Sequence, residues 1–488
     1  MKEDLIINAP NQGVAQSPHG GFADARNLDI STIPGIVRLN NLLAKKSGST
    51  VTEQIKWFRR DPSDPNDCYA VDGNGVVYNS TDAGATWASL SDRSGSGQGL
   101  EIWKDYLFVA TNTALDVYGP LSGAAAWTTG WKTIDSDTVW HPMMVSNNDG
   151  NLYGGAGRYV FSVEEVVGQT FAPGTSTTYT FTQQALDLPA SYKIKCIEEL
   201  GNNLMLGTWR GTNVYDFKIA TIFPWDRSSV SFGQPILLNE NGVHAMLNIG
   251  NLLHILAGIE GKIYVSDGVS AQVAAQIPSS ISNLEDGNYL EPFPGAVAFY
   301  KGRFFFGLAT GGSKIIDGMG VWSMMRTSKG NILNLEHVIS TGNYGSTTVV
   351  KISALLPISR DEILVGWRDD TSYGIDKTTN TSRVTSYAGY FDSPLYQVGT
   401  YWSKRTLSEM EIILAKELAS NEGVRVKYRV NLTDSFSNPI VTFDNTTYGA
   451  VNSHNPWNIP SINTDFIQFR VELTGTTTTP QFKQLRIR

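Results

Sequence analysis

Ser80, Asp82, Gly84 and Thr86 stand at alternate positions of the sequence, and Trp87 follows directly. A carboxylate at this spacing accepts hydrogen bonds from the hydroxyl and amide groups of a tight turn. Glycine adopts backbone angles that other residues avoid, and a tryptophan ring packs between neighbouring sheets. Strand-forming runs lie on both sides, so these residue types predict turn formation in one hairpin, not reaction with a substrate.

The spacing S-x-D-x-G-x-T-W resembles the Asp-box of β-propeller proteins such as sialidases and sortilin-type receptors. Sialidases need three arginines that hold a carboxylate, a tyrosine nucleophile assisted by a glutamate, and an acid/base aspartate. This chain has one intact Asp-box and no Arg-Ile-Pro-like opening, and several of its repeat units lack an arginine at an obvious rim position. We therefore predict that it is not an enzyme, and a sialidase-like glycan hydrolase stays as the last alternative.

Residue types that bind metals or act as nucleophiles are scattered along the chain. The histidines show no H-x-x-x-H spacing and no Cys/His pair, and there is no Walker loop and no G-x-S-x-G. Oxygen-rich tracts at 64–67 and 147–150 fit calcium, but ordinary Asx turns account for them better. We predict no catalytic residue, no metal and no cofactor. The histidines are His19, His141, His244, His254, His337 and His454.

Aromatic residues are numerous, with 12 Trp, 20 Tyr and 20 Phe. Exposed rings on a face of a folded domain stack on sugars, whereas rings between sheets serve packing. We favour packing for any single tryptophan and keep sugar binding as an alternative. The tryptophans considered for it are Trp127, Trp131, Trp140, Trp209, Trp225 and Trp367.

The elements that must position these residues are strands. The chain is 41% hydrophobic and 17% charged, with 47 Gly and 20 Pro, which favours a folded all-β protein that turns often. A strand, turn, strand, turn, strand unit recurs roughly every 40 to 60 residues, a period typical of four-stranded propeller blades and longer than that of a sandwich array or a solenoid. The units are 55–80, 100–119, 143–164, 194–217, 245–268, 297–324 and 352–377.

We predict six or seven blades, because an N-terminal strand can complete the last blade and the Thr- and Ser-rich segment 165–192 can be an inserted loop. Residues 1–50 form an extended arm or irregular cap, and 51–393 form the propeller. Strictly alternating runs such as VRVKYRVNL then predict a jelly-roll-like C-terminal β-sandwich at 394–488. Cys68 and Cys196 lie in apolar strand-like runs, which favours two buried thiols over a disulfide.

The net charge is -8, so the chain lacks the basic footprint that neutralises nucleic-acid phosphates. An acidic surface suits a pore through which DNA slides without sticking. The N-terminus has no apolar signal region, and no run of 18 or more apolar residues occurs, so we predict neither a secretory signal nor a membrane span. We expect synthesis and folding in a cytoplasm.

Two terminal segments resemble phage virion proteins. The stretch from His19 to Asn41 is similar to the opening of such chains, and the residues that carry the likeness are a candidate assembly arm: Arg26, Asn27, Asp29, Pro34, Gly35 and Arg38. The pattern IQ-x-R-x-x-L, followed by TP and the terminal LRIR, resembles the C-terminal sandwich of phage tail proteins.

Together with a propeller, these segments resemble the tail nozzle proteins of short-tailed phages. The resemblance implies a virion structural protein in the tail, present as a ring of about six copies that contacts the adaptor, a portal-proximal ring and fibres or a plug. Genomic DNA would pass through that ring during ejection without specific binding. The first alternative is a receptor-binding propeller at a tail tip or fibre that attaches to a host surface glycan.

Overall fold

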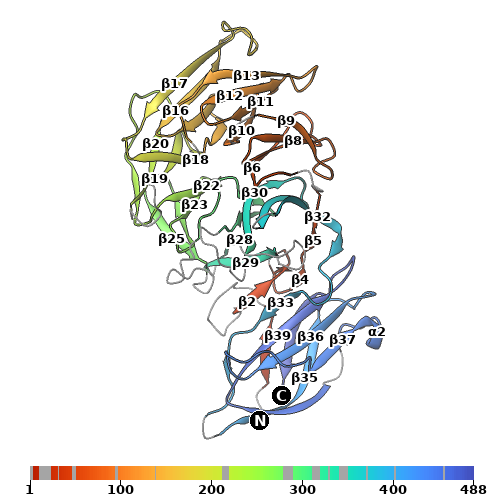
Figure 1. Ribbon diagram of the computed structural model, residues 1–488. Helices are drawn as coiled ribbons and strands as arrows, with labels where there is room; N and C mark the ends of the chain where they lie inside the picture. The colour runs from red at the N-terminus through yellow and green to blue at the C-terminus, as the bar shows by residue number, and fades with distance from the viewer. Residues whose placement is uncertain are drawn as a thin grey trace.

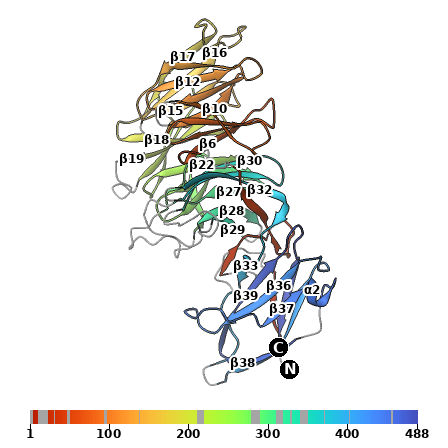
Figure 2. The same ribbon diagram turned by 45° about the vertical axis from the view of Figure 1, so that its right-hand side comes forward.

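The computed structural model describes residues 4–9, 23–30, 32–46, 51–93, 97–137, 139–210, 219–277, 290–309, 319–327, 330–339, 350–369, 372–400, 403–453 and 457–488. Seven four-stranded antiparallel units in this part of the chain surround one axis as a β-propeller. A C-terminal β-sandwich lies beside the propeller, and the two ends of the chain lie close together at its far end (Figures 1 and 2). The predicted all-β propeller with a C-terminal sandwich is confirmed.

Each of blades 1 to 6 is a meander of four consecutive strands, innermost strand first, and blade 7 takes its outermost strand from the N-terminal segment. Blades 1 to 3 comprise β6 (Ile55–Arg60), β7 (Cys68–Asp72), β8 (Val76–Ser80) and β9 (Ala88–Asp92); β10 (Gly99–Trp103), β11 (Tyr106–Ala110), β12 (Ala114–Gly119) and β13 (Ala126–Thr133); and β14 (Met143–Val145), β15 (Leu152–Ala156), β16 (Tyr159–Glu165) and β17 (Tyr179–Asp187). Blades 4 to 6 comprise β18 (Tyr192–Leu200), β19 (Asn203–Arg210), β20 (Ala220–Trp225) and β21 (Ile236–Leu238); β22 (Val243–Ile249), β23 (Leu252–Ala257), β24 (Lys262–Ser266) and β25 (Ala271–Gln276); and β26 (Val297–Tyr300), β27 (Arg303–Gly307), β28 (Gly320–Thr327) and β29 (Gly330–Val338). Blade 7 comprises β30 (Val350–Pro357), β31 (Ile363–Asp369), β32 (Ser372–Arg383) and β5 (Asn41–Lys45).

The ring closes through the N-terminal part of the chain. Strand β5 pairs antiparallel with β32 as the outermost strand of blade 7, and the chain then enters β6 of blade 1. The innermost strands of successive blades contact one another, and β30 contacts β6. The described residues therefore form seven blades, and an N-terminal strand completes the last one. The prediction of six or seven blades included this arrangement.

Two details of the predicted repeat are wrong. Segment 165–192 is not an inserted loop, because β17 lies within it and pairs with β16 as the outermost strand of blade 3. In blade 4 the predicted unit ends at residue 217, whereas the third strand, β20, begins at Ala220; residues 211–218 lie outside the described part of the chain. The other predicted units cover most of the first three strands of their blades, with the largest shortfall in blade 7, where β32 continues to Arg383.

The blades pack face to face. In β27 the consecutive residues Phe304, Phe305 and Phe306 are all buried. Because successive side chains of a strand point to opposite faces, both faces of blade 6 must be covered. Leu256 of blade 5 and Trp367 of blade 7 belong to the same core cluster, so the neighbouring blades supply that cover. Cys68 and Cys196 are buried free thiols, as predicted.

The C-terminal sandwich packs two sheets around one apolar core. One sheet has the order β1-β40-β35-β38, and the other contains β33-β39-β36-β37, with β34 paired to β39. Their bounds are β1 (Leu5–Asn8), β33 (Gly389–Asp392), β34 (Tyr396–Gln397), β35 (Arg405–Leu414), β36 (Gly423–Arg429), β37 (Val441–Asp444), β38 (Trp457–Thr464), β39 (Phe466–Thr474) and β40 (Phe482–Ile487). The short helix α2 (Asn445–Tyr448) follows β37. No helix in the described residues is long and apolar enough to cross a bilayer.

One sheet runs from the propeller into the sandwich. Strand β2 (Asp24–Arg26) pairs in parallel with β29 of blade 6 and antiparallel with β33 of the sandwich, giving a ten-stranded sheet in which β26-β27-β28-β29-β2-β33-β39-β36-β37 follow in order. Strands β3 (Leu28–Asp29) and β4 (Arg38–Leu39) form a small ribbon at the same junction. Within residues 1–50 the described strands thus contribute to the sandwich, the shared sheet and blade 7.

Candidate functional site

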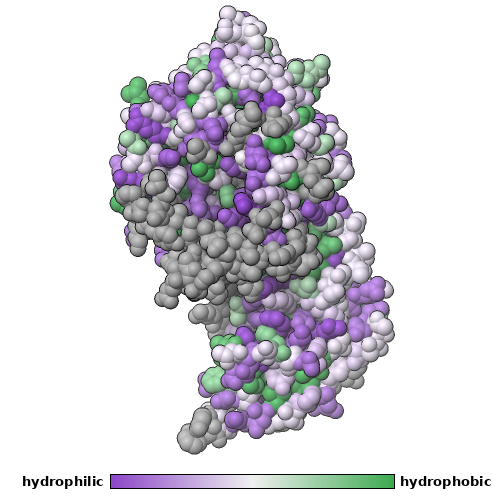
Figure 3. All heavy atoms as spheres, in the orientation of Figure 1, coloured by the Kyte–Doolittle hydropathy of each residue, from purple (hydrophilic) through white to green (hydrophobic). Residues whose placement is uncertain are grey.

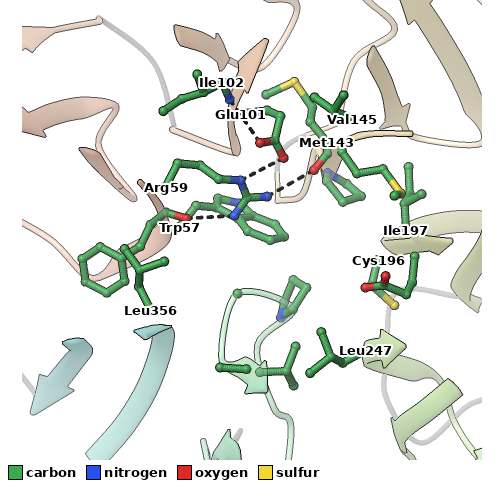
Figure 4. A pocket seen from close by; sticks show the side chains of 18 of the residues that line it. Trp57, Arg59, Glu101, Ile102, Met143, Val145, Cys196, Ile197, Leu247 and Leu356 are labelled. Atoms are coloured by element: carbon green, nitrogen blue, oxygen red, sulfur yellow. Dashed lines mark hydrogen bonds and ion pairs between the residues drawn. The ribbon is translucent and has the colours of Figure 1, made fainter. Parts of the chain in front are cut away.

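The main cavity of the propeller lies on its axis. It has a volume of about 800 Å³ and is lined by the innermost strands of all seven blades, mostly by the carboxyl-terminal halves of these strands (Figure 4). Its wall is largely apolar, with Met143, Met144 and Leu247 among the lining residues, and Phe299 in β26 stays 52% exposed. This is the concave, mainly apolar kind of site that small ligands occupy.

Arg59 is fully engaged inside this cavity. Its Nε donates to Glu101 Oε2 at 2.8 Å, one terminal nitrogen donates to the Phe58 backbone oxygen at 2.8 Å, and the other donates to the Met143 backbone oxygen at 3.2 Å (Figure 4). Burial raises the pKa of Glu101, and the charge of Arg59 opposes that shift. The guanidinium is therefore committed to the wall, which does not favour the capture of a substrate carboxylate that sialidase chemistry requires.

Glu198 in β18 is the second carboxylate of the cavity wall. Burial raises the pKa of Glu198 to about 7, and the neighbouring charge of Glu199 adds to the shift. A carboxyl group with such a pKa exchanges its proton near neutral pH. The cavity thus holds one titrating acid beside one neutralised ion pair.

A polar layer fills the axis next to the cavity. Strand β6 of blade 1 shifts its register at Lys56, and strand β18 of blade 4 shifts its register at Lys195. An extra residue of this kind bends the strand and redirects its side chain. Both ammonium groups lie over the ring of Trp140, at 5.2 Å and 5.8 Å from its centroid. Because blades 1 and 4 lie on opposite sides of a seven-bladed ring, Trp140 blocks the axis.

Lys195 also connects to two further groups on the axis. Its Nζ lies 2.8 Å from Nδ1 of His244, the residue at which β22 shifts register, and 3.2 Å from Oε1 of Glu291. Burial lowers the pKa of His244 to about 3, and the charge of Lys195 acts in the same direction. Burial likewise lowers the pKa of Lys56 to about 8. The layer is a mostly buried network of side chains that come from strands and connections far apart in sequence.

The predicted Asp-box forms the turn between β8 and β9. Asp82 Oδ1 accepts hydrogen bonds from the Ser80 hydroxyl at 2.8 Å and the Thr86 N–H at 2.8 Å, and Asp82 Oδ2 accepts from the Thr86 hydroxyl at 2.7 Å. The Ser80 hydroxyl in turn accepts from the Gly84 N–H at 2.9 Å. All of these hydrogen bonds join residues of the turn, so the Asp-box residues stabilise the turn itself.

The same turn faces the ring closure. Trp87 is buried, its ring lies 5.8 Å from that of Phe58, and its indole N–H donates to the Gly84 backbone oxygen at 3.2 Å. Gly84 has φ +81°, and a Cβ atom there would lie 2.6 Å from Leu364 Cδ2 of blade 7. The Asp-box therefore packs blade 1 against blade 7.

The candidate arm residues gather at the junction of propeller and sandwich. Arg26 in β2 lies opposite Leu335 of β29 in the sheet, and the Arg26 Nε donates to Asp24 at 3.1 Å. Asp29 in β3 pairs with Arg38 at 2.6 Å. The remaining candidates occupy turns in the same segment: Asn27 with φ 57°, Pro34, and Gly35 with φ 74°.

Three of the tryptophans considered for sugar stacking are buried. Trp140 is 5% exposed, and Trp225 and Trp367 are buried still more deeply. The indole N–H of Trp131 donates to the Pro173 backbone oxygen at 2.9 Å, and Lys132 lies over its ring. The packing interpretation therefore holds for the first three, which present no face to a ligand.

The oxygen-rich tracts at 64–67 and 147–150 form turns. The Asn66 N–H donates to Asp64 Oδ1 at 2.9 Å, and the Asn151 N–H donates to Asp149 Oδ1 at 3.0 Å. Among the described residues, no group of three or more His, Cys, Asp or Glu side chains is arranged to hold a metal. His19 and His454 lie outside those residues.

Fold and site together define a seven-bladed β-propeller with a blocked axis, joined through a shared sheet to a β-sandwich. No family model and no curated protein sequence matches the chain. Among solved structures, it is similar to the computationally designed Ika8 protein at 12% identity and a TM-score of 0.40, over 68% of this chain and 99% of that one. It is also similar to YCF48 bound to D1 peptide, at 12% identity and a TM-score of 0.44, over 74% and 100% of the two chains.

Proposed function

We propose that the protein is a structural subunit of a phage tail, in which copies join side by side into a ring of nozzle or hub type around the path of the DNA. The observation that carries this proposal is the ten-stranded sheet that continues from blade 6 through β2 into the sandwich. A shared sheet of this kind makes propeller and sandwich one stiff body, because hydrogen bonds cross every strand boundary. Stiffness across domains is what a ring subunit needs.

Backbone and side-chain contacts on both sides of β2 support the same proposal. The Tyr390 hydroxyl of β33 in the sandwich donates to Asp24 Oδ2 of β2 at 3.2 Å. The Asn334 side chain of β29 donates to the Leu28 backbone oxygen at 2.7 Å. The N-terminal segment is thus held by both domains.

The filled axis limits where DNA can run. Trp140, Lys56 and Lys195 occupy the middle of the propeller, so a duplex cannot pass through it. In the proposed ring the DNA path lies between subunits, with the propellers outside it. The net charge of -8 suits a lining that does not hold phosphates.

Outer strands of neighbouring blades offer a contact surface for ring formation. Leu237 in β21 of blade 4 is 66% exposed, and Val273 in β25 of blade 5 is 54% exposed. Each lies on the outermost strand of its sheet, where free backbone groups and apolar side chains favour association. We place the contact at these outer strands because Leu237 and Val273 are exposed there. On the face shown in Figure 3, the described hydrophobic residues form small separate patches.

Sedimentation of the purified protein tests the proposal. We expect a concentration-dependent species of several times the 53.4 kDa chain mass, and no retardation of duplex DNA at physiological salt. A protein that remains a single chain at tens of micromolar would contradict the ring. A protein that binds duplex DNA tightly would contradict the non-binding lining.

The axial cavity favours a second candidate, a receptor-binding propeller at a tail tip. Phe299, which lines the cavity and is 52% exposed, provides aromatic surface of the kind that stacks on sugars. A glycan array separates the two candidates, since a tip protein binds a defined glycan and a ring subunit binds none. Release of a fluorogenic sugar from a sialoside would instead support the hydrolase alternative.

A further inference from the structure

A second cavity lies at the junction between propeller and sandwich. It has a volume of about 630 Å³. Its lining comes from five regions: the N-terminal segment, the turn between β26 and β27 with the start of β27, Met325 of β28, the turn between β30 and β31 with the end of β32, and Thr479 of the sandwich. Arg360 in the fourth of these regions is exposed, so the cavity opens to solvent there.

Cations outnumber carboxylates in this lining. Five basic residues face two acidic ones, Asp29 and Asp361, and Glu336 lies directly behind the wall. The basic residues are Arg38, Lys301, Arg303, Arg360 and Arg383.

The two buried carboxylates, Asp29 and Glu336, already form ion pairs with arginines. Asp29 receives Arg38 at 2.6 Å and Arg303 at 3.3 Å. Glu336 pairs with Arg303 and accepts hydrogen bonds from the Ser323 hydroxyl at 2.6 Å and the Asn40 amide at 2.7 Å. These two acids therefore balance Arg38 and Arg303.

Among the described residues, no carboxylate pairs with Lys301, Arg360 or Arg383 in this way. In the part of the chain that the structure describes, none of the three makes an ion pair, and the Nε of Arg383 is buried without a hydrogen bond. The second acid of the lining, Asp361, receives the Asn41 side chain at 3.0 Å through its backbone oxygen, not through its carboxylate. A buried donor without an acceptor costs free energy, so an acceptor from outside the chain is favoured here.

The environment of Lys301 and Arg383 also favours a bound anion. Burial lowers the pKa of Lys301 and that of Arg383, and the positive charge of Arg38 adds to the effect on Arg383. A bound anion reverses both effects. Guanidinium groups present forked N–H donors that match the oxygens of a phosphate.

We propose that this junction cavity binds a phosphate group, held by Arg383, Lys301 and Arg360, and that the bound anion ties blades 6 and 7 to the N-terminal segment and the sandwich. The cavity volume lies within the range that accepts a small ligand. Free phosphate and a phosphate carried on a nucleotide share this chemistry. The inference does not depend on ring assembly.

Calorimetric titration of the full chain at constant ionic strength tests the site, with inorganic phosphate in one arm and adenosine monophosphate in the other. We expect saturable binding in at least one arm, weakened about tenfold or more by Arg383→Gln and by Lys301→Gln. Arg158→Gln is the matched control, since Arg158 is a half-buried arginine that pairs with Asp187 at 3.1 Å on blade 3; we expect it to bind as the parent does.

Binding of the nucleotide alone would assign the phosphate to a nucleotide, and equal binding in both arms would assign the site to phosphate itself. Absence of saturable binding to both ligands by the parent protein overturns the inference without any variant. It is also overturned if both cavity variants bind like the parent, because the ligand then lies elsewhere.

Discussion

The side-chain oxygen of Asn27 accepts a hydrogen bond from the backbone N–H of Val338 at 2.9 Å, and the nitrogen of the same side chain donates to the backbone oxygen of Ala388 at 3.1 Å. Val338 ends β29 in blade 6, and Ala388 precedes β33 of the sandwich. One side chain thus links the two domains beside the bridge between Arg26 and Leu335.

Replacing Asn27 therefore weakens the coupling between propeller and sandwich. Asn27→Ala removes both hydrogen bonds and places alanine at φ 57°, a backbone angle that alanine disfavours. We therefore expect the free energy of unfolding to fall by about 2–4 kcal/mol. Asn27→Gly removes the same bonds but tolerates this φ, and it should cost about 1 kcal/mol less. Calorimetry should show the single transition of the parent split into two in the alanine variant. A single unchanged transition would contradict the linking role.

The Asp-box is predicted to stabilise the fold through one carboxylate. Asp82→Ala removes three hydrogen bonds in an exposed turn, and we expect a loss of about 1–2 kcal/mol in chemical denaturation. Thr81→Ala, at an exposed neighbouring position, should change the stability by less than about 0.5 kcal/mol. Equal effects of the two substitutions would show that the Asp82 bonds contribute nothing.

Glu198 predicts a pH-dependent stability. Its pKa rises from 4.5 to about 7 on folding because of burial, so its stabilising contribution is complete below pH 4.5 and is lost as the pH rises through 7. Glu198→Gln keeps the neutral form at every pH. We expect the variant to gain about 1–3 kcal/mol over the parent between pH 4.5 and 7 and to hold that gain at higher pH.

Thermal unfolding measured from pH 4.5 to pH 8.5 checks this expectation. Glu417→Gln, at an exposed position after β35, serves as the control and should give a difference from the parent that does not change with pH. A constant difference for Glu198→Gln as well would mean that this carboxyl group is ionised in the folded protein throughout the range.

Ring formation should depend on the outer strands of blades 4 and 5. In the double variant Leu237→Lys and Val273→Lys, charges replace exposed apolar groups on sheet edges, and we expect the assembled species to fall at least about tenfold at equal concentration. Val167→Lys is the control, because Val167 is 99% exposed but lies in the connection between β16 and β17. Sedimentation profiles that do not distinguish the double variant from the control would place the contact elsewhere.

Local patterns in the sequence were sufficient to predict the inner strands of the blades. The first three strands are apolar runs separated by polar turns, and the Asp-box residues determine their own hairpin. Some outermost strands were missed because they are polar and largely exposed: β25, with the sequence AQVAAQ, has no apolar alternation. The pattern of the N-terminal segment did not reveal its place, since β2 pairs with strands about 310 and 365 residues away in sequence.

The axial layer could not be predicted either. Lys56 and Lys195 meet over Trp140 only because one strand in each blade shifts its register, and such a shift leaves no mark in the sequence. The junction cavity likewise depends on segments that are distant along the chain. Contacts of this kind follow from the closed ring, so they become visible once the blades are placed.

Cryo-electron microscopy of the purified full-length protein at micromolar concentration tests the central claim most directly. We predict closed rings of about six copies, with intact seven-bladed propellers outside a central opening wide enough for a DNA duplex. Isolated single chains throughout the micrographs, or rings whose central opening is the propeller axis itself, would contradict it.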